Sequence, residues 1–395
     1  QSEPIPSSTQ VSNDAGGYSW IVDDWKQLQR FLILGSEGGT YHIAEKQLVR
    51  ENAQAVERCI KNDSSRVIKT VVEISETGRA PKNDPALFVL AMCASIGDDK
   101  TRKEALQSLP KVARIGTHLF HFMQYCSQFR GLGRGLRTAI SKWYQDKSVR
   151  DLAFQVVKYQ SRDGWSNADM LRLSHPKTID PVRNAVYKWI VDGVLLEYYD
   201  DLKIIEGFIN IQNAKSDKEA AKFIMEYSLP LECVPTQFKT SSLVWEALLP
   251  SLGLTALIRN LGNLSKCGLL SKDNWDIKKQ IVDRIANQEA LKKARIHPIA
   301  ILSALCTYSS GHGIKSKGEW ETVPDIIDAL DSAFYLSFSN VQSTGKCRLL
   351  ALDVSGSMSG GAIGGIIGLT PRMASSALAM ITYQRETKCE IVAFQ

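Results

Sequence analysis

The sequence contains no apolar run long enough to span a membrane and none of the common catalytic or nucleotide-binding motifs. Every apolar stretch falls short of the 18 residues that mark a transmembrane helix, so we expect no membrane span. P-loop, GxSxG, HExxH and GxGxxG patterns are all absent. These absences favour a protein that is not an enzyme.

Closely spaced cysteine pairs are also missing. None of the eight cysteines lies close enough to another to form a CxxC zinc or redox motif. Several lie in apolar helical contexts such as FVLAMCAS and ILSALCTY, which is typical of free, buried thiols in a reducing compartment. We therefore expect a location in the cytoplasm, with the nucleus as a further compartment.

The first 17 residues, QSEPIPSSTQVSNDAGG, lack the apolar run of a signal peptide. They are polar and rich in Ser, Pro and Gly, so we expect residues 1–17 to be a disordered tail. No initiator Met is present, and we expect that the chain is processed or begins inside its gene product. The net charge of +6 is mildly basic and is by itself only weak evidence for an anionic partner.

Between about Trp20 and Phe338 the pattern is helix after helix. Apolar residues recur three or four apart in the stretches 53–60, 65–74, 85–94, 152–159, 216–225 and 243–249. The connections, such as KNDSS, GRAPKNDP and GSEGG, are short and polar. Helices joined by short turns, without strands, predict a mainly α fold of stacked helix pairs.

Near Ser343 the pattern changes to strand, helix and strand. Residues 349–354 are a short apolar run typical of a buried strand in a parallel sheet. A Gly-rich stretch follows, then the helical sequence RMASSALAMITYQRE and a second strand candidate, Cys389–Phe394. This order predicts a domain boundary near residue 341 and the beginning of an α/β domain. Because an open α/β domain needs more than two strands, we expect residues 342–395 to be a truncated domain.

Five strings together resemble one family. GSEGGTYHI (35–43), KYQSRDGWSNADMLRLSHPK (158–177), LTALIRNLG (254–262), KKARIHPIAILSAL (292–305) and LLALDVSGSM (349–358) are similar to the Ro autoantigen, or TROVE-module, family. They occur in family order and span nearly the whole chain. The resemblance implies a ring of HEAT-like helical repeats over residues 18–341, closed by a von Willebrand factor A-type, Rossmann-like domain.

The same resemblance implies a function in RNA quality control and ribonucleoprotein assembly. In the family, the basic central hole holds single-stranded 3′ ends of misfolded non-coding RNAs, and the outer surface binds small structured Y RNAs. The expected partner is thus small non-coding RNA rather than DNA, and the expected form is a monomer. The alternative is a protein–protein scaffold in which the helical repeats and a metal-dependent A-type domain bind an acidic partner.

Residues 130–177 are the most basic part of the chain. They carry ten positive and four acidic side chains, an excess of six that equals the net charge of the whole sequence. A spacing of four and three places Arg130, Arg134 and Arg137 on one predicted helical face, opposite Leu136, Ile140 and Trp143. The candidate RNA-binding residues are Arg130, Arg134, Arg137, Lys142, Lys158, Arg162, Arg172 and His175.

Charge alone favours an ordinary solvated helix face at these positions. The resemblance reverses that preference, because Lys158, Arg162 and His175 fall in the segment that matches the family's RNA-binding surface. Arg offers a planar fork for phosphate oxygens, and Lys a point charge. Tyr159 and Trp165 could stack on bases, although we favour a core position for Trp165.

A candidate metal site follows the first C-terminal strand. Asp353, Ser355 and Ser357 supply oxygen ligands of the kind that Mg²⁺ or another divalent cation prefers. The resemblance implies direct ligation by the two hydroxyls, with Asp353 acting through water. The loops that complete this site in A-type domains are missing here, and the alternative is that the pattern serves only its turn geometry. His118 and His121 have a spacing that could bind a metal on a helix, but we expect packing, because no acidic or Cys partner is nearby in the sequence.

Overall fold

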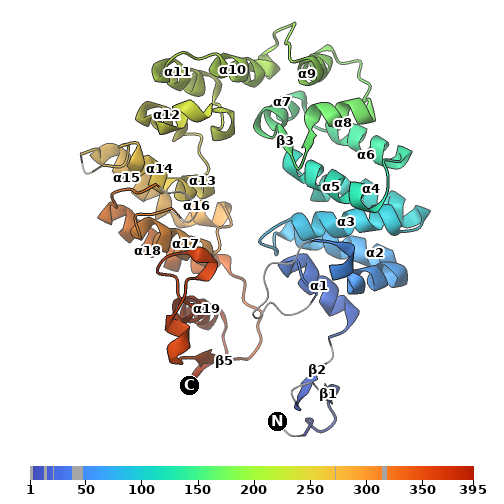
Figure 1. Ribbon diagram of the computed structural model, residues 1–395, viewed down its shortest axis with the longest axis vertical. Helices are drawn as coiled ribbons and strands as arrows, with labels where there is room; N and C mark the ends of the chain where they lie inside the picture. Colours follow the sequence, from blue (N-terminus) through green and yellow to red (C-terminus); the bar gives the residue numbers. More distant parts are fainter. Residues whose placement is uncertain (1–2, 13–15, 21, 38–47, 272, 314–317) are drawn as a thin grey trace. The chain divides into compact units, whose positions relative to one another are not determined.

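The computed structural model describes residues 3–12, 16–20, 22–37, 48–271, 273–313 and 318–395, and it divides into two compact units. Unit 1 comprises residues 1–206 and unit 2 residues 207–395. Helices dominate both units, and a parallel strand–helix–strand element ends the second, which confirms the predicted fold class (Figure 1). None of the described helices combines the length and the hydropathy needed to cross a membrane.

Unit 1 is a stack of helices with two very small sheets. Its helices are α1 (Asp24–Leu34), α2 (Gln54–Thr77), α3 (Asp84–Ile96), α4 (Asp99–Val112), α5 (Gly116–Phe129), α6 (Arg134–Gln145), α7 (Val149–Lys158), α8 (Asn167–Ser174) and α9 (Pro181–Asp192), with 3₁₀ turns at Arg50–Asn52 and Asp200–Leu202. Its strands are β1 (Gln10–Ser12), β2 (Tyr18–Trp20), β3 (Ser161–Arg162) and β4 (Trp165–Ser166). Helix α10 (Lys203–Gln212) contains the division between the units.

Helix α3 forms the centre of the unit 1 core. It is apolar all round, as a helix enclosed by others must be, and it packs against α1, α2, α4 and α5. The fully buried ring of Phe88 contacts the rings of Phe31, Tyr125 and Phe129, with centroids 5.3–5.7 Å apart. Aromatic contacts at these separations add to the stabilisation from burial.

The predicted connection KNDSS is a kink rather than a loop. Helix α2 runs through it, but Asp63 has non-helical φ/ψ values of −151° and 84°. Its carboxylate accepts a hydrogen bond from the backbone N–H of Arg66 at 3.0 Å, as a residue at a helix start does. The two predicted helical stretches are therefore one bent element whose second half begins at Asp63.

Short strands interrupt a region that the sequence predicts to be purely helical. Strands β1 and β2 pair antiparallel, so an extended pair includes part of the predicted tail. Strands β3 and β4 also pair antiparallel, with Arg162 opposite Trp165. Strands of two or three residues leave little periodicity in a sequence, so the sequence predicts neither pair.

Unit 2 continues with shorter helices and ends in the parallel strand pair. Its elements are α11 (Asp217–Tyr227), α12 (Ser242–Leu248), α13 (Leu254–Arg259), α14 (Leu261–Lys266), α15 (Trp275–Ile285), α16 (Gln288–Lys293), α17 (Pro298–Ser309), α18 (Pro324–Leu336), β5 (Arg348–Asp353), α19 (Pro371–Arg385) and β6 (Cys389–Phe394), with 3₁₀ turns at 231–233, 236–240, 337–340, 356–359 and 363–365. Strands β5 and β6 pair in parallel from Arg348 opposite Cys389 to Asp353 opposite Phe394.

The predicted strand–helix–strand order is correct, but the predicted burial of the first strand is wrong. Leu349 in β5 is 65% exposed, and Leu378 in α19 is 51% exposed. Within the described part of the chain, β5 pairs with β6 and packs against α19. A strand is buried on both faces only when further strands and helices cover it.

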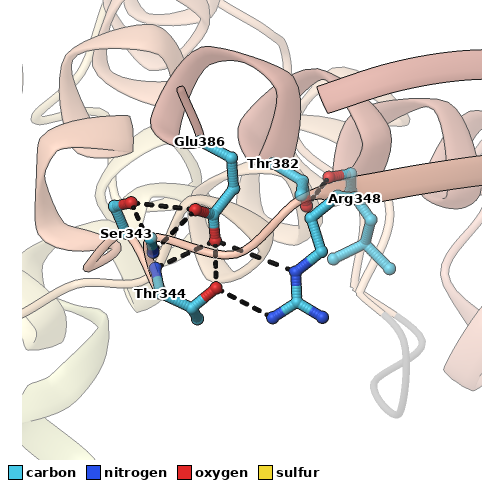
Figure 2. A network of polar contacts seen from close by, with 7 residues as sticks. Ser343, Thr344, Arg348, Thr382 and Glu386 are labelled. Carbon is cyan, nitrogen blue, oxygen red and sulfur yellow. Dashed lines mark hydrogen bonds and ion pairs between the residues drawn. The ribbon is translucent and has the colours of Figure 1, made fainter. Parts of the chain in front are cut away.

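The segment that leads into β5 is hydrogen-bonded to the end of α19. Figure 2 shows the carboxylate of Glu386 accepting hydrogen bonds from Ser343 Oγ and from the backbone N–H and hydroxyl of Thr344, at 2.6–2.9 Å. Arg348 lies 3.9 Å from the same carboxylate. These donors hold the pKa of Glu386 at about 2, the hydroxyl of Thr344 being the first cause.

Candidate nucleic-acid interface

Helix α6 turns its apolar face inward and its arginines outward, as the sequence predicts. Leu136, Ile140 and Trp143 are buried, and Trp143 Nε1 donates a hydrogen bond to the carbonyl oxygen of Ala113. Arg134 and Arg137 are exposed on the opposite side. Burial of the apolar face therefore fixes the helix in an orientation that keeps both guanidinium groups in solvent.

Arg130 does not share that helix, which corrects the prediction that three arginines lie on one helical face. It caps the C-terminus of α5 in an extended conformation, with φ −157°, and Gly131, Leu132 and Gly133 separate it from α6. The 3.6-residue period does not continue through Gly131–Gly133. Arg130, Arg134 and Lys142 nevertheless line one groove of about 740 Å³, together with Arg102 and Lys103 from α4.

The β3–β4 hairpin is held against α5 by side chains. Trp165 Nε1 donates to Gln124 Oε1 at 3.3 Å, and the imidazole of His121 contacts the Asp163 carboxylate at the hairpin turn. His121 Nε2 also lies 3.7 Å from a carboxylate oxygen of Asp84. The expectation that His121 lacks an acidic partner is therefore wrong, because folding brings both carboxylates to it.

The predicted capping box at the start of α8 is present. Ser166 Oγ accepts from the backbone N–H of Asp169, whose carboxylate accepts from the backbone N–H of Ser166 at 2.9 Å. Satisfying these two donors fixes the point where the hairpin becomes a helix. Arg172 and His175 are thereby placed at the far end of a helix with a defined start.

The remaining candidate cations surround this hairpin. Arg162 in β3 is 62% exposed at its side chain, and its Nε lies 3.7 Å from Asp163. Lys158 ends α7, is half-buried rather than exposed as expected, and holds its ammonium 5.6 Å from the ring centroids of Phe154 and Tyr159.

Beyond the hairpin, Arg172 and His175 complete the set. Arg172 is exposed and donates to the carbonyl oxygen of Val191 at 3.2 Å. His175 is exposed and ends α8 with a left-handed φ of 45°. Eight candidate residues thus fall into the groove group Arg130, Arg134 and Lys142, the hairpin group Lys158, Arg162, Arg172 and His175, and Arg137 on the outer face of α6.

One buried residue that joins these elements was missed in the sequence. Asn167 is 5% exposed, and its Oδ1 accepts a hydrogen bond from the hydroxyl of Tyr144 on α6 at 2.7 Å. Its Nδ2 donates to the carbonyl oxygens of Tyr159 and Gln160, at 2.8 and 3.4 Å. In the sequence, the only sign of this role is that Asn167 is a polar residue directly after the helix cap Ser166. Trp165, expected in the core, is only half-buried.

Two further histidines, His118 and His297, are structural. Burial lowers the pKa of His118 to about 4, and its ring lies 3.4 Å from the side-chain amide of Asn83. His297 caps the start of α17 by accepting a hydrogen bond from the backbone N–H of Ile299 at 3.2 Å, and burial lowers its pKa. In the described residues, no cluster of three or more His, Cys, Asp or Glu side chains could hold a metal ion.

The candidate metal ligands lie together at the carboxyl end of β5. Asp353 Oδ1 accepts from the backbone N–H of Ser355 at 2.9 Å, and the hydroxyls of Ser355 and Ser357 are 3.0 Å apart. Arg372 from α19 donates to the carbonyl oxygens of Val354 and Ser355, at 2.9 and 3.1 Å. The oxygen donors suit Mg²⁺, but they come from one loop and have a guanidinium cation beside them. They are therefore an incomplete fit to a metal that demands octahedral coordination.

These features define a helical-repeat protein with a cationic surface on its first unit and a parallel strand–helix–strand element at its end. The model of the TROVE domain matches residues 11–224 and 224–307. The chain belongs to the TROVE-domain family.

Named relatives span nearly all of this chain. A Deinococcus radiodurans protein named RNA-binding protein RO60 is 41% identical over 387 residues, covering 98% of this chain and 73% of that protein. A Caenorhabditis elegans protein of the same name is 33% identical over 463 residues, covering 98% and 71%. The crystal structure of the D. radiodurans RO (RSR) protein is similar with a TM-score of 0.85, covering 94% of this chain and 75% of that one.

Proposed function

We propose that this chain binds RNA without catalysing a reaction on it. The observation that carries the proposal is the hairpin group, in which cationic side chains from α7, β3 and α8 lie on elements that meet at one short hairpin, itself held against α5. Rigidly placed Arg and Lys side chains suit phosphate oxygens, and phosphate contacts dominate the affinity of proteins for nucleic acids. Two relatives named as RNA-binding proteins support the same partner.

Within RNA, the proposed partners are small structured non-coding RNAs of the Y RNA type and misfolded RNAs with a single-stranded 3′ end. The family resemblance suggests both, and with them a role in ribonucleoprotein assembly and RNA quality control in the cytoplasm or nucleus. RNA chemistry favours this choice as well. The deep major groove of an RNA helix hides its base edges, so shape, phosphates and unpaired segments are what a protein surface can recognise.

The hairpin group is tested by replacing Lys158 and Arg162 together with Ala. Affinity for a structured RNA should fall by about tenfold if two phosphate contacts are lost, and the dependence of affinity on salt should become shallower. Filter binding at several salt concentrations measures both. A melting curve of the double variant and of Arg162→Ala alone serves as the control. Arg162→Ala should change it little, because Arg162 is largely exposed, and any larger loss in the double variant reports the half-buried Lys158. Unchanged affinity and salt slope would remove these residues from the site.

The second candidate function is a protein–protein scaffold that uses a divalent cation. Its supporting observation is the oxygen set of Asp353, Ser355 and Ser357, which could take Mg²⁺ and, through it, an acidic side chain of a partner. The two functions respond differently to conditions. RNA binding should weaken steeply with salt and persist in a chelator, whereas a metal-mediated protein contact should disappear in the chelator.

A further inference from the structure

A groove in unit 1 lies between α4 and α6 and is bordered at one end by the C-terminus of α5. Its volume of about 740 Å³ lies in the range of about 300–1,000 Å³ that is typical of small-ligand sites. We call it the α4–α6 groove. It contains three of the candidate RNA-binding residues, but the hairpin group lies outside it.

The walls of the α4–α6 groove are strongly cationic. Five lining side chains are positive, namely Arg102, Lys103, Arg130, Arg134 and Lys142, and the acidic one among the described lining residues is Asp99. Arg102 pairs with Asp99 at 2.8 Å and Lys142 with Asp146 at 2.8 Å. Lys103, Arg130 and Arg134 form no ion pair within the described residues, so the groove offers uncompensated positive charge.

Arg102 gives a second sign that an anion belongs in the groove. Its Nε is buried and has no acceptor in the described part of the chain. A buried donor without a partner costs free energy, so structures rarely leave one. Arg102 also lines the groove, so an anionic ligand bound there would lie beside a guanidinium group that still has an unused donor.

The floor of the α4–α6 groove is aliphatic. Leu106 and Pro110 from α4 face Leu136 and Ala139 from α6, and the lining residues that the structure describes include no aromatic ring. Such a floor suits the apolar face of a planar ring, held by aliphatic contacts and guanidinium planes rather than by aromatic stacking. Gly135 sets the spacing of the walls, because a Cβ there would lie 3.2 Å from Leu106 Cδ1.

We propose that the α4–α6 groove binds a single unpaired nucleotide of an RNA whose paired part lies on the neighbouring cationic surface. The base would lie on the aliphatic floor, and its phosphates would contact Arg134, Lys103 and Arg102. This inference rests on the proposed function, since it assumes an RNA partner. An RNA ligand is favoured over an acidic peptide because Arg137, next to the groove on α6, continues the positive charge outside it.

The chain provides a matched pair of variants for the test. Arg134 and Arg137 are exposed arginines three residues apart on α6, but only Arg134 lines the groove among the described residues. Arg134→Gln should therefore impair nucleotide capture, and Arg137→Gln serves as its control. Ala139→Leu fills the floor while keeping every cation. Ala139 is half-exposed on a helix, so this change is compatible with folding.

The experiment compares two RNA hairpins with the same stem, one of which carries a single unpaired 2-aminopurine nucleotide. The unmodified chain should bind the hairpin with the unpaired nucleotide about tenfold more tightly, and the probe's fluorescence should change on binding. Ala139→Leu should abolish this preference while retaining affinity for the fully paired hairpin. Arg134→Gln should also abolish the preference, and it should lower the affinity for the fully paired hairpin by no more than Arg137→Gln does. Arg137→Gln should lower both affinities by the same factor and leave the preference intact. Melting curves identify any variant that fails to fold.

The outcomes separate the two proposals. If the unmodified chain binds neither hairpin, the proposed function itself is wrong. If it binds both equally, or if Ala139→Leu keeps the full preference, the chain binds RNA but the groove is no nucleotide site. If a peptide of alternating Leu and Glu displaces the 2-aminopurine signal at lower concentration than a fully paired hairpin does, the groove is a peptide site and the inference is overturned.

Discussion

Asn167 is the residue whose removal should disturb the candidate interface most, although it touches no solvent-facing cation. Its side chain joins α6, the end of α7 and the start of α8 through three hydrogen bonds. In Asn167→Ala, two well-formed bonds are lost at about 1 kcal/mol each, and the buried hydroxyl of Tyr144 loses its acceptor at a further cost of about 1 kcal/mol. We expect the free energy of unfolding of unit 1 to fall by about 3 kcal/mol.

A double-mutant cycle with Tyr144 isolates the central bond. Tyr144→Phe alone should cost about 1.5 kcal/mol, because it leaves Asn167 Oδ1 buried without a donor. In the Asn167→Ala background the same change should recover about 1 kcal/mol, since it removes a hydroxyl that is already unsatisfied. The double variant should therefore be about 2 kcal/mol less stable than the unmodified chain, and not about 4.5 kcal/mol.

The assay must report on unit 1 separately, because two units can unfold in two steps. Hydrogen exchange of the backbone amides in α6 and α8, measured at several urea concentrations, meets this need. Costs that simply add in the double variant would show that the Tyr144–Asn167 bond contributes nothing. A loss below about 0.5 kcal/mol in Asn167→Ala would refute the reasoning altogether.

Three further predictions concern ionisation and metal binding. Because burial lowers the pKa of His118 from 6.5 to about 4, its neutral form stabilises the fold fully above pH 6.5, and that stability is lost as the pH falls toward 4; His118→Gln should flatten this part of a plot of melting temperature against pH. The pKa of Glu386 is lowered from 4.5 to about 2, so the stability that its hydrogen bonds to Ser343 and Thr344 contribute is fully present above pH 4.5 and is lost as the pH falls through 2. Glu386→Gln should therefore increase hydrogen exchange at Thr344 near pH 7, while α17 keeps its protection. Mg²⁺ should bind weakly or not at all to this chain in isothermal titration, and tight binding that Ser355→Ala abolishes would contradict the incomplete fit of the β5 loop.

The features that the sequence predicted well are local ones. The apolar face of α6 and the capping box of Ser166 and Asp169 depend on residues three or four positions apart, and such spacings can be read directly. The error at Arg130 has a local cause too. A helical period was continued across two glycines, where the chain leaves one helix before entering the next.

The features that escaped prediction depend on residues distant in the sequence. His121 meets Asp163 across 42 positions, and Tyr144 meets Asn167 across 23. Neither pair leaves a periodic signal, because tertiary packing alone brings the partners together. The exposure of β5 escaped for a related reason: its apolar composition indicates a strand, but only its neighbours determine which of its faces is buried.

Several bonds hold the β3–β4 hairpin, although each of its strands has only two residues. The position of Arg162 in this hairpin suggests why. Arg162 lies in β3, and a segment so short cannot hold a side chain in place by its own ladder of hydrogen bonds. Its position is instead fixed from outside, by His121 at the turn, Gln124 at Trp165 and Asn167 at the helix start. The backbone that carries Arg162 is thus ordered before RNA binds, so only its exposed side chain remains to be ordered when it meets a phosphate. The bonds behind the hairpin would then support the affinity that its exposed charge provides.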